Sequence, residues 1–354
     1  MKRILVTGVG GSASQNFIAS LRMAPEPFYI VGTDTNPYHL ACADVEARYV
    51  LPRCDEPGYL QTLLSLLASE NIELLHPQPD VEVAFLSAHR EEIPVRLKLP
   101  SRRAVELCHD KAACNAAMAQ RGVPVPAGYR VEALDALPEL FHTLQQAGEK
   151  VWLRAIRGAG SRAALPVTSV RQAREWIHYW EAGRGLTPQD FMLSTFLPGR
   201  EFAFQSVWHQ GRLVTSMARE RMEYLFGNLM PSGQSSSPSI ARTVHRADVN
   251  EAGTRAVQSV DSVPDGVYCV DMKEDADGRP SVTEINPGRF FTTSNFFSEA
   301  GSNMPYYYVR LAFGERLPAL PAYNPLEADL YWVRGVDRTP TLLRGEAWIA
   351  KSAA

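Results

Sequence analysis

Cysteine and histidine are sparse in this sequence, and neither forms a recognisable metal-binding pattern. The five cysteines include no CxxC pair, and the eight histidines include no HExxH motif. These absences argue against a zinc site. The odd number and the scatter of the cysteines indicate reduced thiols. The sequence also shows no convincing Ser–His or Cys–His arrangement for nucleophilic catalysis.

Long apolar runs and an excess of one charge are absent as well. No apolar run approaches the roughly 20 residues that a membrane-spanning helix needs. The net charge of −3 predicts no general attraction to nucleic acid or to anionic membranes. The opening Lys2-Arg3 leads into Ile4-Leu5-Val6 and then glycine, which is too short a run for a signal peptide. We therefore expect a cytoplasmic protein.

The 354 residues, 45% of them hydrophobic, are sufficient for two or three domains. In the first third of the chain, strand and helix patterns alternate. We expect strands at residues 2–7, 28–33, 72–77 and 95–99, and helices at 14–23, 57–69 and 82–91. This alternation predicts a parallel sheet with helices on both faces.

The first expected strand ends in a glycine turn, residues 8–13, that matches the dinucleotide-binding pattern G-x-G-x-x-A. Asp34 lies about 20 residues beyond the turn, as that pattern requires. One interpretation is an NAD-dependent enzyme. The other is that close packing of helix on strand favours glycine and alanine here. Because the rest of the chain shows no clear dehydrogenase half, the second interpretation is favoured.

The middle of the chain carries candidate phosphate-binding groups. A helix is expected at residues 102–121, with a break near His109-Asp110, and Lys111 lies on it. A later expected strand carries Arg154 and runs into the glycine loop 157–162. Backbone N–H groups of such a loop can cover phosphates. A solvated lysine and an ordinary hairpin loop are the plainer alternatives.

Two further groups follow on expected strands. The apolar segment 191–197 could receive an adenine ring on its backbone, and Glu201 could accept ribose hydroxyl bonds; the alternative is two core strands. Arg219 and Arg221 are two residues apart and therefore share one face of a strand. Two like charges so placed repel unless an anion lies between them, which favours binding of a triphosphate or a carboxylate. The alternative is a solvated strand edge.

The most specific pattern is Glu-Ile-Asn-Pro-Gly-Arg, which begins at Glu284 where an expected strand ends in a turn. Glu284 and Asn286 are two apart and point to the same face. A hairpin through the turn at 275–278 would bring Asp271 close to Glu284. Carboxylate and amide oxygens suit Mg²⁺, and Arg289 suits a phosphate held by that ion.

In the order of these motifs, the chain resembles the ATP-grasp superfamily, nearest the branch of carbamoyl phosphate synthase large-chain domains and carboxylate–amine ligases. The resemblance covers nearly the whole chain and implies an α/β and α+β architecture. It implies an N-terminal parallel α/β (pre-ATP-grasp) domain at 1–103, a linker helix and lid subdomain at 104–195, and a catalytic subdomain at 196–354. ATP would lie between the last two.

The resemblance also implies a role for each motif. The residues that it assigns to ATP are Lys111 and Arg154 for the phosphates, Gly158, Gly160 and Ser161 for the lid loop, Met192, Leu193, Ser194 and Thr195 for the adenine hinge, and Glu201 for the ribose. The residues that it assigns to the metal are Asp271, Glu284 and Asn286. Arg289 would steady the transferred phosphoryl group. The sequence departs from the family where Ser194-Thr195 replaces the frequent Gln-Glu or Glu-Glu, and where Gly288 moves Arg289 one position later.

The implied reaction uses ATP and Mg²⁺, for which Mn²⁺ can substitute. A carboxylate attacks the γ-phosphate to give an acyl phosphate, and an amine or another nucleophile then displaces phosphate. Arg219, Arg221 and Arg289 are the expected catalytic residues. The expected partners are a small-molecule carboxylate and an amine, with no nucleic acid and no membrane. A homodimer is left open.

Three other classes of protein stay open. A carbamoyl-phosphate-synthase-like enzyme that activates bicarbonate ranks second, because the chain holds one ATP-grasp unit and shows no ammonia-supplying partner. An NAD-dependent oxidoreductase follows from the glycine turn. A non-catalytic nucleotide-binding protein is disfavoured because all three metal-type ligands are present.

Overall fold

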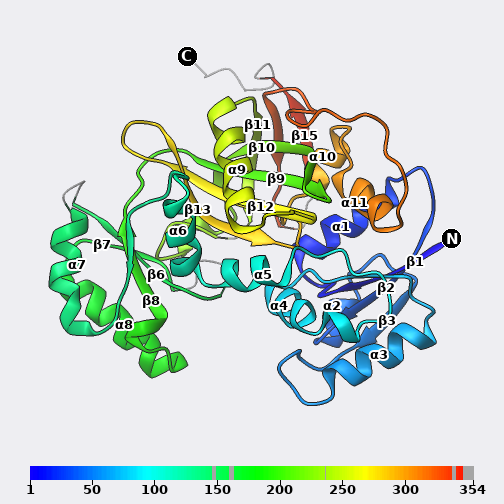
Figure 1. Cartoon of the computed structure of the whole chain (residues 1–354), viewed down its shortest axis with the longest axis horizontal. Coiled ribbons are helices and arrows are strands. Elements are labelled where there is room, and N and C mark those ends of the chain that lie inside the picture. The colour runs from blue at the N-terminus through cyan, green and yellow to red at the C-terminus, as the bar shows by residue number, and fades with distance from the viewer. Residues whose placement is uncertain (146–148, 159–162, 236, 337–339, 346–354) are drawn as a thin grey trace.

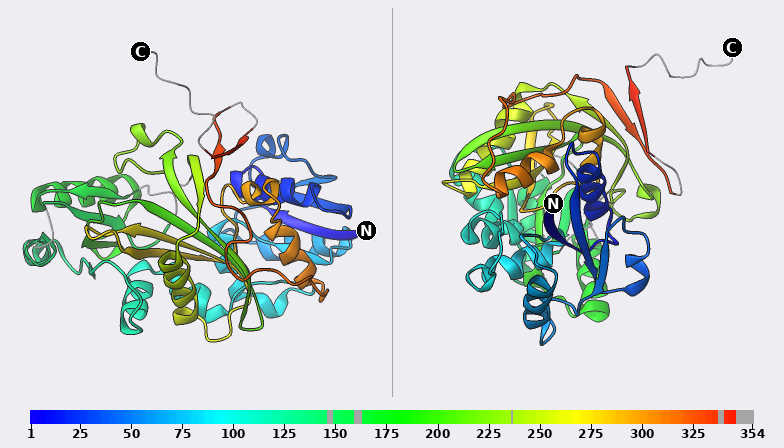
Figure 2. Two further views of the ribbon diagram at one scale, coloured as in Figure 1. Left: turned by 90° about the horizontal axis from the view of Figure 1, so that it is seen from above. Right: turned by 90° about the vertical axis from the view of Figure 1, so that its right-hand side faces the viewer.

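The computed structural model describes residues 1–145, 149–158, 163–235, 237–336 and 340–345. Strands within this part of the chain form three sheets. Figure 1 shows the N-terminal sheet and the small sheet of β6–β8 at opposite ends, with the large sheet between them, and the view from above agrees (Figure 2). No described helix is long and apolar enough to cross a membrane.

The N-terminal sheet is parallel and has the order β3-β2-β1-β4. Its strands are β1 (Lys2–Thr7), β2 (Phe28–Asp34), β3 (Ala47–Val50) and β4 (Leu74–His76), and its helices are α1 (Ser12–Arg22), α2 (Pro37–Leu40), α3 (Tyr59–Ser69) and α4 (Asp80–Ala88). Ile4 packs with Phe17 of α1, whereas the next residue, Leu5, packs with Leu63 of α3. Helices therefore cover both faces, as the alternating pattern predicts.

One expected strand of this sheet is wrong. Residues 95–99 form only an isolated bridge, between Leu74 and Arg96. The fourth strand is β3 instead, which runs parallel to β2. It escapes detection because Arg48, Tyr49 and Val50 are not buried, so this edge strand lacks an apolar signal.

The glycine turn after β1 is filled by protein groups. The backbone N–H of Gly10 donates to Asp34 Oδ2 at 2.9 Å. A Cβ atom on Gly10 would lie 2.3 Å from the Cβ of His39 and 2.9 Å from Asp34 Oδ2. Glycine is thus required here by packing alone, which supports the packing interpretation of the motif.

Gly10→Ala is expected to lower the melting temperature, because the added methyl group forces His39 and the Asp34 carboxylate apart at a cost of about 1–3 kcal/mol. Thermal unfolding measures the effect. The control is Gly11→Ala, whose nearest contact would be the Gly8 carbonyl at 3.3 Å, and it should lose less. An unchanged melting temperature together with a loss of nucleotide binding would show that the dinucleotide-binding interpretation of this turn is the right one.

The middle of the chain forms a linker and a small antiparallel sheet. The linker helices are α5 (Arg102–His109) and α6 (Lys111–Gln120), so the expected break near His109-Asp110 is confirmed. Asp110 caps α6 by accepting from the Ala113 N–H at 2.9 Å. The sheet has the order β5-β8-β6-β7. Its strands are β5 (Gly128–Arg130), β6 (Val151–Ala155), β7 (Leu165–Val167) and β8 (Phe191–Thr195), and α7 (Leu137–Leu144) and α8 (Val170–Arg184) pack on it.

The large sheet has the order β13-β12-β9-β10-β11-β14-β15. Its strands are β9 (Glu201–His209), β10 (Arg212–Tyr224), β11 (Pro238–Val244), β12 (Gly266–Glu274), β13 (Pro280–Pro287), β14 (Leu330–Val333) and β15 (Thr341–Arg344). Short 3₁₀ turns occur at Arg90–Glu92, Leu134–Ala136, Pro188–Asp190 and Gly227–Leu229.

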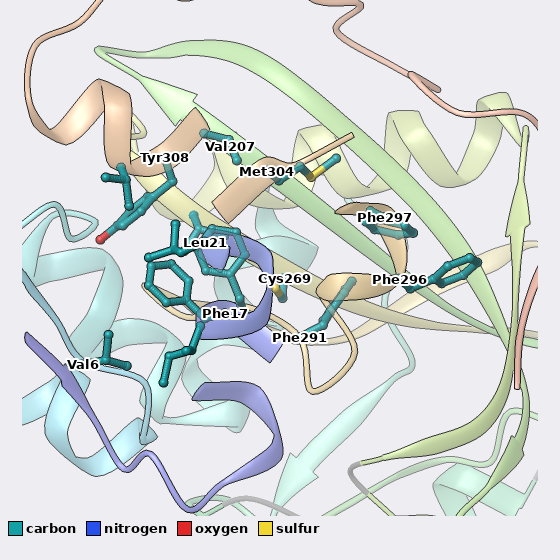
Figure 3. Close-up of a cluster of buried hydrophobic side chains, with 14 of the residues drawn as sticks. Val6, Phe17, Leu21, Val207, Cys269, Phe291, Phe296, Phe297, Met304 and Tyr308 are labelled. Carbon is teal, nitrogen blue, oxygen red and sulfur yellow. The ribbon is translucent and has the colours of Figure 1, made fainter. Parts of the chain in front are cut away.

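The two faces of the large sheet have different neighbours. Helix α9 (Ala247–Val260) packs on one face through Val249 and Val257. The other face meets α1 of the N-terminal domain, α10 (Asn295–Glu299) and α11 (Met304–Ala312). Side chains from these helices, from the N-terminal sheet and from the large sheet form one apolar cluster (Figure 3). That second face also carries the candidate site, beyond the limit of the apolar cluster.

Candidate active site

The expected hairpin is present, and it aligns the three predicted metal ligands. Strands β12 and β13 pair antiparallel with Asp271 opposite Glu284. Asn286 follows two residues after Glu284 on the same face. Its Nδ2 lies 3.5 Å from Asp271 Oδ2 and 3.4 Å from Glu284 Oε1. Two carboxylates and one amide therefore converge on one spot.

Two cations from other elements reach the same carboxylate. Arg154 of β6 donates through Nη2 to Glu284 Oε2 at 2.5 Å, and through Nη1 to the Thr283 carbonyl at 3.4 Å. Lys111, the first residue of α6, lies with Nζ 3.9 Å from Glu284 Oε2. The site thus spans the large sheet, the small sheet and the linker helix.

The charges shift the two carboxyl groups in opposite directions. Burial opposes ionisation of Glu284, but Arg154 and Lys111 outweigh it and hold the pKa of Glu284 well below its usual value. Burial raises the pKa of Asp271 to about 6; Arg221 opposes the rise and Glu284 adds to it. Burial also lowers the pKa of Lys111, although Glu284 acts against this shift. Opposed shifts within one cluster are typical of functional sites.

Arg289 closes the cluster from the turn after β13. Its Nη2 donates to Asn286 Oδ1 at 2.5 Å, and its Nε forms an ion pair with Asp80 at the start of α4. The preceding Gly288 has φ +77°, and a Cβ there would lie 2.8 Å from Leu99. The extra glycine therefore lets the turn pass close to the N-terminal domain. Asp80 is a neighbour that sequence reasoning missed, since nothing in the local sequence separates it from an ordinary first-turn acid.

Glu201 is the first residue of β9. Its carboxylate accepts from Lys273 Nζ at 2.6 Å, from Gln234 Nε2 at 2.5 Å and from the Tyr224 hydroxyl. Burial works against ionisation, but Lys273 and these bonds hold the pKa of Glu201 below its usual value. Lys273 was also missed, although its position two residues after Asp271 places it on the same face of β12.

Arg219 and Arg221 do share a face of β10, but their surroundings differ. Arg221 donates to Asp271 Oδ1 at 2.5 Å, and this partner outweighs burial and raises the pKa of Arg221. Arg219 is 1% exposed and lies over the ring of Phe291, 4.4 Å from its centroid. The solvated strand edge is therefore excluded for both side chains.

The expected adenine hinge falls mostly within a central strand. Residues Met192–Thr195 belong to β8, which pairs with β5 on one side and β6 on the other. Leu193 is fully buried in the core of the small sheet, and the Thr195 N–H donates to the Ala127 carbonyl at 2.9 Å. The predicted hinge residues Met192, Leu193 and Ser194 thus each pair with a strand on both sides.

The glycine loop is described only at its start. Gly158 has φ +97°, and its carbonyl accepts from Lys111 Nζ at 2.7 Å. Gly160 and Ser161 lie outside the described residues. Lys111 thus joins the start of the loop to Glu284.

The donor set fits a hard cation. The described residues hold no group of three or more His, Cys, Asp or Glu side chains that could bind a metal. Asp271 and Glu284 with the amide of Asn286 are oxygen donors of the kind that Mg²⁺ prefers when it keeps several waters and phosphates. The Asn286 amide here donates from Nδ2 toward the two carboxylates and accepts from Arg289 through Oδ1, so its oxygen would reach a cation only if the amide turned and released Arg289. Nitrogen and sulfur ligands are absent from this cluster, which disfavours Zn²⁺.

Comparisons with known proteins agree with this architecture. Residues 4–96 match the family described as PylC-like, N-terminal domain. No curated protein matches the chain by sequence. N5-carboxyaminoimidazole synthetase from Staphylococcus aureus, complexed with ADP, superposes with a TM-score of 0.70 at 14% identity over 94% of this chain and 82% of that one.

Two other solved structures are similar over 94% of this chain, each with a TM-score of 0.69. One is the biotin carboxylase domain of 2-oxoglutarate carboxylase from Hydrogenobacter thermophilus, in complex with MgADP, ADP and bicarbonate (16% identity, 73% of that chain). The other is L-amino acid ligase from Bacillus licheniformis (12% identity, 79% of that chain). All three are ATP-grasp proteins, and the chain has the ATP-grasp fold that its motifs predict.

Proposed function

We propose that this protein is an ATP-dependent ligase that activates a carboxylate as an acyl phosphate for attack by an amine. The observation that carries the proposal is the convergence of Asp271, Glu284 and Asn286 on one hairpin, faced by Arg154 and Lys111 from two other elements. Oxygen ligands for a divalent cation beside two cations for phosphate are what phosphoryl transfer requires.

Each residue then has one task. Mg²⁺ held by Asp271, Glu284 and Asn286 would supply neutralisation of phosphate charge. Lys111 and Arg154 bind the phosphate oxygens, and Glu201 accepts from the ribose hydroxyls. Arg289 stabilises the negative charge of the phosphoryl group in transit. An oxygen of the substrate carboxylate attacks the γ-phosphorus and ADP leaves; the amine nitrogen then attacks the acyl carbon and phosphate leaves.

The parts of the fold divide this work. We propose that residues 104–195 form the lid subdomain and 196–354 the catalytic subdomain, with ATP between the small and the large sheet. The ion pair of Arg154 with Glu284 supports this placement, because it crosses that boundary at 2.5 Å. Residues 1–103 would contribute to the acceptor side through Asp80, which meets Arg289.

Activation of bicarbonate is a second candidate. The similar biotin carboxylase domain was solved with bicarbonate and MgADP. The same cluster would serve, since bicarbonate is itself a small carboxylate. A screen of acid and amine pairs for ADP release, with bicarbonate as one of the acids, separates the two candidates, and mass measurement of the product identifies the new bond.

Calorimetric titration is expected to show Mg²⁺-dependent binding of ATP and no comparable binding of NAD. The reason is that cationic and oxygen ligands for a triphosphate gather at Glu284, whereas His39 and Asp34 fill the glycine turn. Titration of ATP with EDTA in place of Mg²⁺ is the control and should weaken binding. Tight NAD binding without ATP binding would refute the ligase.

A further inference from the structure

Arg219 stands in the same cross-strand row as the metal-type carboxylates. Asp271 on β12 pairs with Ala203 on β9, and Ala203 pairs with Arg219 on β10. Glu284 continues the row on the far side of Asp271. With a strand spacing of about 4.8 Å, Arg219 lies about 10 Å from Asp271, measured between backbones. Arg219 and the Arg154–Lys111 pair therefore approach the cluster from opposite sides.

Arg219 is a buried cation that forms no ion pair with a described carboxylate. Its side chain is 1% exposed, and among the described residues its Nε and Nη1 have no hydrogen-bond partner. Burial, with Arg221 nearby, lowers the pKa of Arg219 to about 9, although Asp271 acts against this shift. Arg221 and Arg242, by contrast, each hold a carboxylate within 2.6 Å. A buried unpaired charge is costly, so a site of this kind is expected to hold an anion when the protein works.

A second cation and a polar segment stand beside it. Arg334, which follows β14, donates through Nη1 to the Thr292 carbonyl at 2.9 Å, and burial lowers its pKa. The segment that begins at Phe291, whose ring covers Arg219, also holds the buried hydroxyls of Thr293 and Ser294, and neither has a partner within the described residues. Figure 3 shows Phe291 beside Cys269 at the edge of the apolar cluster. Arg219 therefore lies where the polar site meets the core.

We propose that Arg219, with Arg334 adding positive charge, binds the carboxylate group that the ligase activates. This inference rests on the proposed function. The planar guanidinium matches a carboxylate through two parallel N–H bonds, and an aromatic ring on its face holds it in one plane. Arg154 and Lys111 bind the triphosphate from the side of the small sheet. The carboxylate bound at Arg219 would then face the γ-phosphate across Asp271, so the substrate is an organic acid with its carboxylate innermost.

Acetate is the probe for this site, and thermal unfolding of the full chain is the measurement. At constant ionic strength, acetate in place of chloride should raise the melting temperature of the wild type, because it binds only the folded state. Arg219→Met should start with a higher melting temperature in chloride, since it removes the unpaired buried charge. It should also abolish the rise with acetate. Arg219→Lys, which keeps the charge but loses the planar fork, should bind acetate at least tenfold more weakly.

Arg242→Met is the matched control, since Arg242 pairs with Glu220 on the opposite face at 2.6 Å. It should lower the melting temperature and leave the response to acetate unchanged. Failure of the wild type to respond to acetate, or an Arg219→Met variant that is less stable and still responds, would overturn the proposal. Wild-type protein that binds acetate through Arg219 yet neither binds Mg²⁺-ATP nor releases ADP would refute the ligase and leave the anion site standing.

Discussion

Glu284→Gln is expected to lower Mg²⁺-dependent release of ADP from ATP by at least about a hundredfold, while the protein stays folded. Glu284 is the carboxylate that Asp271, Asn286, Arg154 and Lys111 all face. An amide of the same shape keeps a hydrogen-bond acceptor for Arg154 but loses the negative charge that a divalent cation requires. ADP release is measured by a coupled assay, and folding by circular dichroism.

Glu220→Gln is the control for loss of a buried, arginine-paired carboxylate from the same sheet. Glu220 accepts from Arg242 at 2.6 Å on the opposite face, away from the cluster. This variant should lose stability and keep turnover. If Glu284→Gln turned over Mg²⁺-ATP at nearly the wild-type rate, the assignment of the metal to this hairpin would be wrong.

Arg154→Met is expected to lower kcat/KM for Mg²⁺-ATP roughly 10- to 100-fold, because it removes charge-assisted bonds worth about 1.5–3 kcal/mol. Arg154 is the residue of the small sheet that reaches the large one at Glu284. Its loss should therefore affect the nucleotide more than the carboxylate substrate. Initial rates at varied ATP, with the other substrates held constant, give the parameter.

Arg154→Lys is the matched variant. Lysine keeps the positive charge at this place while losing the guanidinium fork. It should retain activity within about tenfold of the wild type, because a point charge still binds phosphate. Equal losses in both variants would indicate that the geometry of the Arg154–Glu284 pair matters more than its charge.

The hairpin of β12 and β13 is a feature that local sequence is sufficient to predict. Asp271 and Glu284 are joined by one short turn, and residues two apart on a strand must share a face, so their meeting follows from local geometry alone. The same rule places Arg219 and Arg221 together on β10. The break of the linker helix at Asp110 is local too, since this side chain caps the following helix.

The ion-pair partners of these residues could not be predicted from local sequence. Asp80 meets Arg289 and Arg154 meets Glu284 across more than a hundred residues of sequence. No local pattern records such contacts, because they depend on how separate sheets pack. The edge strand β3 was missed for a related reason: it is defined by its pairing with β2 and not by burial of its own side chains.

The sequence by itself determined most of the order of the elements, although not β3, and the hairpin that brings Asp271, Glu284 and Asn286 together, because turn chemistry and strand alternation are local properties. The order of its motifs indicated the family of folds. Only the tertiary structure decided which charges are satisfied. Arg221 finds Asp271, whereas Arg219, two residues away, is buried over Phe291 with two nitrogens that no described residue accepts from. The energy of a charge depends on the burial and the partners that packing gives it, and neither is encoded in the spacing of two arginines.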